Sequence, residues 1–342
     1  MKNYLVIPAF YEGTSFEDLV LELVHMLETL KINVEIIGQK TPLSNNLPCD
    51  DLDDNSFFNI QTDIVNELIN KISSPAKILF LDFFFPSIDL IKYFLSRNKI
   101  NCKLGALLHG GLFLENDLFQ SERWLKYFEY GYFEAFDMMY APSSYLKKKV
   151  PDRFKDKIKV FSWGLDYFYK SLDSEKISHE FDVIFPHRIT DDKGVTGLIY
   201  IAKQLPSIQF CTTLPQIPSE KNANKYIQRL RAFENITIVA GKNRSDHTDT
   251  LKSAKIVLSC AKQENFGYAV HKAVLCGCIP VLPNRLCYPE FFDKRYLYED
   301  LDEAIEMIKK YLGKNNKNNI MTLKSREKIP SFANLVNNFF YE

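Results

Sequence analysis

Short apolar runs alternate with amphipathic segments along almost the whole chain. The runs are rich in Val, Ile, Leu and Phe, as buried strands are. Between them, apolar residues recur three or four positions apart. In residues 15–31, Leu19, Leu23 and Leu27 share one stripe, which predicts a helix capped by Ser15. Strands that alternate with helices predict parallel sheets covered by helices. The predicted strands are residues 4–9, 33–37, 77–83, 103–108, 138–141 and 157–162, then 182–185, 208–212, 236–239, 255–259 and 279–282.

The chain is 342 residues long, which favours two domains over one. The polar run 171–180 is the best candidate for a linker. We therefore expect an N-terminal Rossmann-like domain in residues 1–170 and a second one in residues 181–315. Residues 316–342 would form a last helix that packs back on the first domain. The predicted fold class is α/β, with two Rossmann-like domains facing a central cleft and ligands beyond the strand carboxyl ends.

Composition excludes several classes of protein. Lys and Arg total 43, and Asp and Glu total 43, so the net charge is zero and argues against blanket binding to nucleic acid. The seven cysteines are odd in number and form no C-x-x-C pair, which argues against a disulfide framework or a zinc site. No stretch has the length and hydrophobicity of a membrane span, and the first apolar run is too short for a signal peptide. We expect a cytoplasmic protein.

Two predicted strands of the first half end in polar residues. His109 and Gly110 directly follow an apolar strand, where the backbone would turn toward a ligand. Asp82 lies inside an apolar run and needs a partner or a ligand. The alternatives are an incidental histidine in a turn and a structural hydrogen bond from the carboxylate.

The loop before the first predicted helix is a third candidate. It contains Glu12, Gly13 and Thr14, and the glycine lets backbone N–H groups approach a ligand. This loop would lie on the acceptor side of the site. Taken alone, the same residues also fit a plain turn into a helix.

Arg188 and Lys193 stand five residues apart around a predicted turn that follows a strand. Arginine supplies a planar fork of donors and lysine a point charge, and together they suit a diphosphate. The alternative is a pair of solvated cations in a polar loop.

The segment Glu264, Asn265, Phe266 and Gly267 opens a predicted helix. Free N–H groups at a helix start attract phosphate, and a glycine there allows a close approach. A carboxylate beside a phosphate is unfavourable unless it binds something else, such as sugar hydroxyls. Glu264 is therefore the most informative acid in the chain, although it also fits an ordinary charge at a helix N-terminus.

These motifs together resemble a known family. Residues 262–267, followed by 288–290, resemble the donor-site signature of retaining GT-B glycosyltransferases of family four. The pair His187-Arg188, followed by Lys193-Gly194, resembles the same family's Arg and Lys on the donor diphosphate. Within that family, the chain is most similar to the glycosyltransferase-like domain-containing proteins, which mannosylate queuosine in tRNA.

The resemblance implies a GT-B fold, transfer with retention of anomeric configuration, and neither a metal nor another cofactor. It implies that Arg188 and Lys193 hold the diphosphate of a nucleotide-sugar and that Glu264 orients the donor sugar. His109 and Asp82 would act from the other domain. The implied donor-binding residues are Arg188, Lys193, Glu264, Asn265, Phe266, Gly267 and Lys272.

Two positions depart from the family. The family has a second Glu eight residues after the first, which holds the ribose hydroxyls, and this chain has Lys272 there. Either another acid holds the ribose, with Glu290 the nearest in sequence, or the Lys272 side chain points elsewhere. The related group also has a histidine after the glycines of the first loop, where this chain reads Thr14 and Ser15.

The predicted function is transfer of a sugar from a nucleotide-sugar to an acceptor, with a modified nucleobase in tRNA or DNA as the leading candidate. A basic run at 147–159 and aromatic residues at 127–132 fit such an acceptor. They fit a solvated lysine face and a helix core equally well. A glycan or small-molecule acceptor, a nucleotide-sugar epimerase of the same fold, and an inactive binding module remain alternatives.

Overall fold

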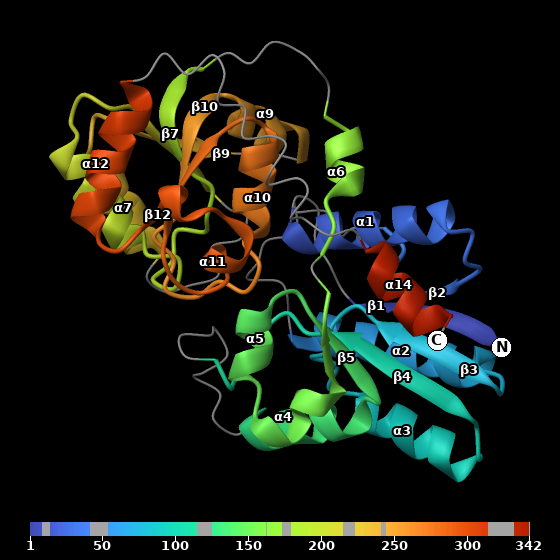
Figure 1. The fold of residues 1–342 in the computed structure, drawn as a ribbon. Helices are drawn as coiled ribbons and strands as arrows, with labels where there is room; N and C mark the ends of the chain where they lie inside the picture. Colours follow the sequence, from blue (N-terminus) through green and yellow to red (C-terminus); the bar gives the residue numbers. More distant parts are fainter. Residues whose placement is uncertain are drawn as a thin grey trace. The chain divides into compact units, whose positions relative to one another are not determined.

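The computed structural model describes residues 1–8, 14–41, 54–114, 125–161, 163–172, 179–214, 223–240, 244–313 and 332–341. The chain divides into two compact units (Figure 1). The N-terminal unit comprises Met1–Tyr167 and Pro330–Glu342, and the C-terminal unit comprises Phe168–Ile329. Each unit is built on a six-stranded sheet.

The sheet of the N-terminal unit has the strand order β2-β1-β3-β4-β5-β6, and all its pairings are parallel. In the register of its central strands, Tyr4 lies beside Ile78, which in turn lies beside Leu104. The strands are β1 (Lys2–Ile7), β2 (Glu35–Gly38), β3 (Ala76–Phe80), β4 (Cys102–Leu107), β5 (Met138–Ala141) and β6 (Ile158–Val160).

Helices cover both faces of this sheet (Figure 1). On one face, Tyr4, Ile78 and Leu104 pack in one hydrophobic core with residues of α2, α3 and α4. Alternate strand residues point to the other face, which carries α1 and α14. The helices of the unit are α1 (Ser15–Thr29), α2 (Asp54–Lys71), α3 (Ile88–Arg97), α4 (Leu125–Ala135), α5 (Ser144–Lys149) and α14 (Ala333–Phe340), with α6 (Asp166–Lys170) at the unit boundary.

The C-terminal helix α14 is part of the N-terminal unit. A Cβ added at Gly105 of β4 would come within 2.4 Å of the Phe339 ring, so the glycine makes room for that ring. Lys77 Nζ donates to the Phe340 carbonyl at 3.1 Å, and Tyr140 Oη donates to Asn338 Oδ1 at 3.1 Å. Buried polar contacts therefore reinforce the apolar packing of the helix on the sheet.

The sheet of the C-terminal unit has the order β12-β11-β10-β7-β8-β9, again with parallel pairings throughout. The core on one of its faces joins strand residues to α7, α8 and α12. The strands are β7 (Phe181–Phe185), β8 (Phe210–Leu214), β9 (Ile236–Ala240), β10 (Ala254–Leu258), β11 (Ile279–Pro283) and β12 (Leu297–Tyr298). The helices are α7 (Val195–Gln204), α8 (Ala223–Arg231), α9 (Arg244–Lys252), α10 (Tyr268–Leu275), α11 (Tyr288–Phe291) and α12 (Leu301–Leu312).

Each strand order has a point where the chain reverses its direction across the sheet. Counted from its first strand, the C-terminal sheet reads 3-2-1-4-5-6, which is the Rossmann order, with the reversal between β7 and β10. The N-terminal sheet begins 2-1-3-4-5, with the reversal between β1 and β3. In such sheets a ligand binds outside the carboxyl ends of the two strands at the reversal. Topology alone thus marks one candidate site in each unit.

Local differences from the sequence expectations are small. Thr14, not Ser15, caps α1, because the Thr14 hydroxyl accepts the Glu17 N–H at 3.3 Å. The run predicted as a strand at 157–162 contributes only Ile158–Val160 to the sheet, after a 3₁₀ turn over Asp152–Lys157. The helix predicted over 118–133 is observed as Leu125–Ala135, and residues 115–124 lie outside the described part.

Candidate donor-binding site

Two loops meet at the reversal point of the C-terminal sheet. The first joins β7 to α7 through residues 186–194, and the second joins β10 to α10 through residues 259–267. The backbone N–H groups of Lys262 and Gln263 donate to the Asp192 carbonyl at 2.8 and 3.1 Å. These bonds fix the second loop against the first, although about seventy residues separate them in sequence.

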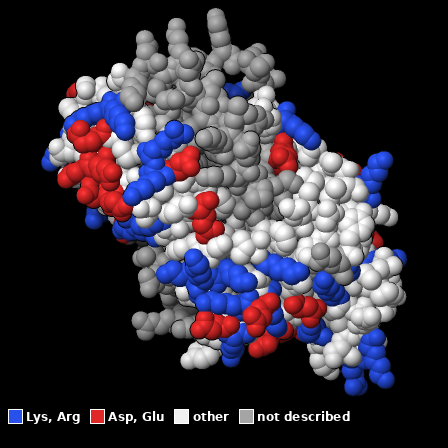
Figure 2. Space-filling view, viewed as in Figure 1, with Lys and Arg blue, Asp and Glu red and all other residues white. Residues whose placement is uncertain are grey.

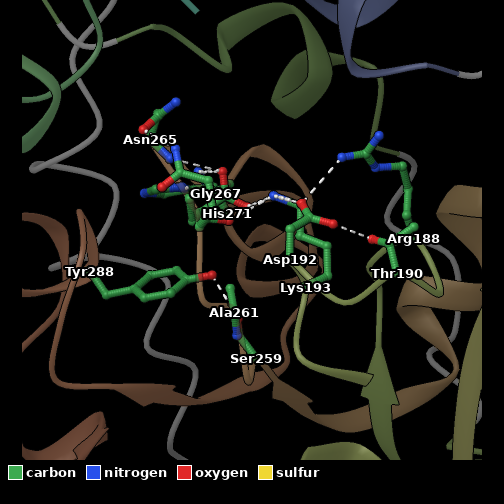
Figure 3. A network of polar contacts seen from close by, with 12 residues as sticks. Arg188, Thr190, Asp192, Lys193, Ser259, Ala261, Asn265, Gly267, His271 and Tyr288 are labelled. Atoms are coloured by element: carbon green, nitrogen blue, oxygen red, sulfur yellow. Dashed lines mark hydrogen bonds and ion pairs between the residues drawn. The ribbon is translucent and has the colours of Figure 1, made fainter. Parts of the chain in front are cut away.

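The Asp192 side chain organises the first loop (Figure 3). Its Oδ2 accepts Arg188 Nη2 at 3.3 Å, and its Oδ1 accepts the Thr190 hydroxyl at 2.5 Å. Lys193 Nζ lies 3.6 Å from the same Oδ2. The Asp192 carboxylate is buried, while the Arg188 side chain that pairs with it is 36% exposed.

Lys193 reaches across to the second loop. Its Nζ donates to the Gln263 carbonyl at 2.9 Å and to Glu264 Oε2 at 3.2 Å. The side chains of Lys193 and Glu264 are 14% and 16% exposed, so the pair is largely sheltered from solvent. A Lys–Glu pair of this kind holds both charges in place in the absence of a ligand.

Glu264 accepts hydrogen bonds from three donors of the protein. Besides Lys193, it accepts the backbone N–H groups of Asn265 at 3.2 Å and Gly267 at 3.1 Å through Oε1. Burial alone would raise the pKa of this carboxyl, but Lys193, His187 and the Gly267 N–H outweigh it and hold the pKa at about 2. Glu264 is therefore ionised at neutral pH and shapes the turn into α10.

Two glycines allow the loops to approach. Gly194 has φ of 74°, and a Cβ there would lie 2.0 Å from the Cys260 carbonyl oxygen. Gly267 has φ of 83°, and a Cβ there would lie 3.1 Å from a ring carbon of Tyr288. Both positions combine left-handed backbone with close packing, which only glycine tolerates easily.

Arg188 is the network member best placed to meet an anion. Its side chain is 36% exposed, and its one ion pair among the described residues is with Asp192. Most N–H groups of its fork remain available for phosphate oxygens. Within the network, two cations face two carboxylates, so the cluster of Arg188, Asp192, Lys193 and Glu264 has no net charge before a ligand binds.

Aromatic residues of α10 and α11 pack against the second loop and the end of β10. Phe266 stacks on His271 of α10 with ring centroids 4.6 Å apart, and His271 Nδ1 donates to the Gly267 carbonyl at 3.0 Å. Tyr288 of α11 shares a 2.7 Å hydrogen bond with Ser259 at the end of β10. These contacts fix the turn that Glu264 and Gly267 form.

Lys272, which stands where the family has its second Glu, is buried on α10. Its Nζ lies 4.8 Å from the centre of the Phe168 ring in the same unit. Glu290, the other acid considered for the ribose, lies on α11 and is exposed.

The candidates of the first half lie at the matching edge of the N-terminal sheet. His109 Nε2 donates to the Leu81 carbonyl at 2.6 Å, and the imidazole packs between Phe16 and Trp163. Asp82, next to Leu81, accepts the Phe84 N–H at 3.0 Å. Burial raises the pKa of the Asp82 carboxyl, and His109 opposes that shift.

The structure thus gathers the predicted site residues into two groups, one in each unit. Asp82, His109 and Gly110 form the group at the N-terminal sheet, and Thr14 caps α1. Glu12 and Gly13 lie outside the described residues. The group in the C-terminal unit is Arg188, Lys193, Glu264, Asn265, Phe266 and Gly267, with Lys272 on the same helix that Gly267 opens.

Sequence reasoning assigned no role to Asp192, Thr190 or the Gln263 carbonyl. Asp192 precedes a predicted phosphate-binding lysine, and that adjacency was the available signal. Its central position depends on the approach of a loop about seventy residues away, which no local pattern reveals.

Comparison with known proteins agrees with this geometry. Residues 170–328, which contain the whole network, match the family described as glycosyl transferases group 1. Over 131 residues the chain is 34% identical to the tRNA-queuosine alpha-mannosyltransferase of Drosophila melanogaster, covering 36% of this chain. The match spans about a third (33%) of that curated relative's length.

Solved structures match the whole fold. Sucrose-phosphate synthase from Thermosynechococcus elongatus superposes with a TM-score of 0.71 at 13% identity, covering 100% of this chain and 98% of that one. A glycosyltransferase from Rickettsia africae superposes with a TM-score of 0.64 at 16% identity, covering 99% and 94%. The predicted α/β GT-B fold class is confirmed. The family match supports the predicted enzyme class, a glycosyltransferase, for the part of the chain that it covers.

No helix in the described ranges is long and apolar enough to cross a membrane. Within those same ranges, no group of three or more His, Cys, Asp or Glu side chains is arranged to hold a metal ion.

Proposed function

We propose that this chain transfers a glycosyl group from a nucleotide-sugar to an acceptor, with the donor diphosphate bound by Arg188 and Lys193. The observation that carries the proposal is the buried network at the β7–β10 reversal point, where Rossmann-type sheets bind nucleotides. The match of residues 170–328 to glycosyl transferases group 1 supports the same assignment.

Arg188 and Lys193 supply the chemistry that the leaving group needs. When the bond from the sugar to the diphosphate breaks, negative charge grows on the departing phosphate oxygens. Preorganised cations stabilise that charge more than they stabilise the intact donor, which lowers the barrier. Asp192 and Glu264 hold the two cations in position beforehand, so no rearrangement is needed at the moment of reaction.

We further propose that transfer proceeds with retention, as the resemblance to family four implies, and that Glu264 orients the donor sugar. The two Glu264 oxygens already accept three N–H donors from the protein, which fixes the carboxylate rigidly. His109 and Asp82 are proposed to act on the acceptor side. His109 Nε2 is committed to the Leu81 carbonyl, so Nδ1 is the nitrogen that accepts hydrogen bonds.

For the acceptor, we propose a modified nucleobase of tRNA. The support is the partial similarity to the Drosophila tRNA-queuosine alpha-mannosyltransferase. The basic run at 147–159 lends less support than its composition suggests, because four of its lysines make internal contacts. Lys147 and Lys157 donate to backbone carbonyls, Lys155 pairs with Asp152, and Lys159 donates to Asn338.

What remains of the run is a smaller exposed group. Lys148 and Lys149 are exposed at the end of α5, and the Arg153 guanidinium lies 4.5 Å from the Tyr130 ring of α4. Tyr127, one turn before Tyr130, is 83% exposed. Figure 2 shows both signs of charge interspersed over the visible face, so an RNA-binding surface here would be local.

The test is transfer from labelled nucleotide-sugars. The protein is incubated with each donor and with tRNA containing queuosine, tRNA lacking it, modified DNA, or no acceptor. Label in queuosine-containing tRNA alone is the expected result. An isomerised sugar without acceptor would mean an epimerase. Label in modified DNA or in tRNA lacking queuosine would change the acceptor assignment, and inactivity with every donor would contradict the proposal. Arg188→Ala should lower turnover on the order of 100-fold.

A further inference from the structure

His187 has a buried imidazole that makes no hydrogen bond with any of the described residues. It lies between β7 and Arg188 and is 5% exposed. Its ring packs edge-on against Phe185, with centroids 5.0 Å apart. Its Nε2 is fully buried and has no hydrogen-bond partner among the described residues. A buried polar atom without a hydrogen-bond partner lowers the stability of the fold, so the presence of a histidine at this position needs an explanation.

The charged groups around His187 are those of the donor site. Glu264, Lys193, Asp192 and Arg188 are the groups that act on its pKa, two toward the charged form and two against it. Burial outweighs them and lowers the pKa to about 4, so the ring is neutral at pH 7. His187 therefore lies against the network without adding charge to it.

His271 makes a useful contrast within the same unit. It is also buried with an unpartnered Nε2, and burial also lowers its pKa to about 4. Its Nδ1, however, donates to the Gly267 carbonyl, and its ring stacks on Phe266 and contacts Phe291 and Phe292. Those contacts explain His271 as a packing residue. Within the described part of the chain, no such hydrogen bond anchors His187.

We propose that His187 is a donor-binding residue whose Nε2–H donates a hydrogen bond to a phosphate oxygen of the nucleotide-sugar diphosphate. Phosphate oxygens only accept hydrogen bonds, and a neutral imidazole carries one N–H to donate. The inference rests on the proposed function, since it extends the same diphosphate site. The imidazole adds a neutral N–H donor to the two cations and so strengthens binding of the diphosphate. Because it is uncharged, it holds the nucleoside diphosphate product less tightly than a third cation would.

The experiment is a calorimetric titration with UDP and GDP as probes, and with uridine and guanosine as ligands without phosphate. His187→Phe keeps a flat ring and removes the N–H, and His187→Gln places an amide N–H where Nε2 was. His187→Asn, which is too short to reach that point, provides a second loss variant if His187→Phe does not fold. His179→Phe, at an exposed position just before β7, is the matched control.

Loss of one hydrogen bond to a charged group predicts diphosphate binding about tenfold or more weaker in His187→Phe and His187→Asn. His187→Gln should retain most of the affinity, and His179→Phe all of it. Any residual nucleoside binding should be equal in all variants.

The outcomes separate the two proposals. If the wild type binds a nucleoside diphosphate and both loss variants bind it equally well, His187 does not contact the phosphate and the inference is overturned. If the wild type binds no nucleoside diphosphate, the proposed function fails and this inference fails with it. If affinity for the unphosphorylated nucleoside falls by the same factor, His187 acts through the fold and the inference is again overturned.

Discussion

Lys193 Nζ lies 3.2 Å from Glu264 Oε2, and this pair joins the loop after β7 to the loop after β10. The partners come from sequence positions 71 residues apart and are both largely buried. Each needs the other, because an isolated buried charge is strongly unfavourable. The pair therefore links the proposed donor site to the stability of the C-terminal unit.

Glu264→Gln tests the link between the proposed donor site and the stability of the C-terminal unit. The amide cannot accept from both Lys193 and the two backbone N–H groups as the carboxylate does, so we expect turnover to fall and the C-terminal unit to lose about 1–3 kcal/mol. The measurements are steady-state kinetics and the free energy of unfolding. Glu306→Gln, at an exposed position of α12, is the control. Wild-type kinetics with several donors would remove Glu264 from the site.

Asp192→Asn tests the organisation of the phosphate-binding cations. The amide keeps the size of the side chain but loses the charge that holds Arg188 at 3.3 Å and attracts Lys193. The backbone carbonyl of residue 192, which fixes the second loop, stays in place. We expect kcat to fall more than KM for the donor rises, since the cations remain but are less well oriented. An unchanged kcat would show that Asp192 does not position them.

Acid should destabilise the C-terminal unit through its two buried histidines. The folded-state pKa of His187 and of His271 is about 4, below the ordinary value of 6.5. Between these values the unfolded chain binds more protons, so stability falls as the pH drops from about 6.5 to 4, by about 3 kcal/mol per histidine. Glu264, with a pKa of about 2 against 4.5, contributes a further loss only below pH 4.5.

Denaturant unfolding between pH 7 and pH 4 measures this loss. His271→Gln removes one of the two titrating groups, so its stability should change less steeply over that interval than that of the wild type. His25→Gln, which changes a histidine on α1 of the other unit, should leave the steepness almost unaltered. Parallel curves for His271→Gln and the wild type would contradict the assignment of a neutral buried His271.

The proposed RNA contact makes a prediction about salt. If Lys148 and Lys149 each neutralise a phosphate, their double replacement by alanine should reduce the log–log salt slope of tRNA binding by about 1.4–1.8. Lys309→Ala, an exposed lysine on α12 of the other unit, is the control. An unaltered slope would place the acceptor surface elsewhere.

The sequence was most informative where a local pattern decides the structure. Short apolar runs located the central strands, and Arg188 and Lys193 lie in the loop after β7, as their position after a predicted strand indicated. The Ser15 cap was wrong by one residue, because Thr14 and Ser15 both have hydroxyls and only the backbone decides which one caps the helix.

Contacts between distant segments could not be predicted in this way. Asp192 is central only because the second loop binds its backbone carbonyl. The ammonium groups of Lys157 and Lys159 donate to carbonyl and amide oxygens that come close to them only in the folded chain. In the sequence these lysines look the same as the exposed Lys148 and Lys149. The tertiary structure decides whether the ammonium group of a lysine is already hydrogen-bonded within the protein or is available to a ligand.

The central claim is that the network at the β7–β10 reversal point holds a nucleotide-sugar diphosphate. Thermal unfolding of the wild type and of the Arg188→Ala/Lys193→Ala double variant, each with and without saturating nucleoside diphosphate, tests it most directly. At 100 times its Kd, the ligand should stabilise the wild type by about 2.7 kcal/mol and the double variant by far less. Equal stabilisation of both proteins, or none of the wild type by any nucleoside diphosphate, would contradict the claim.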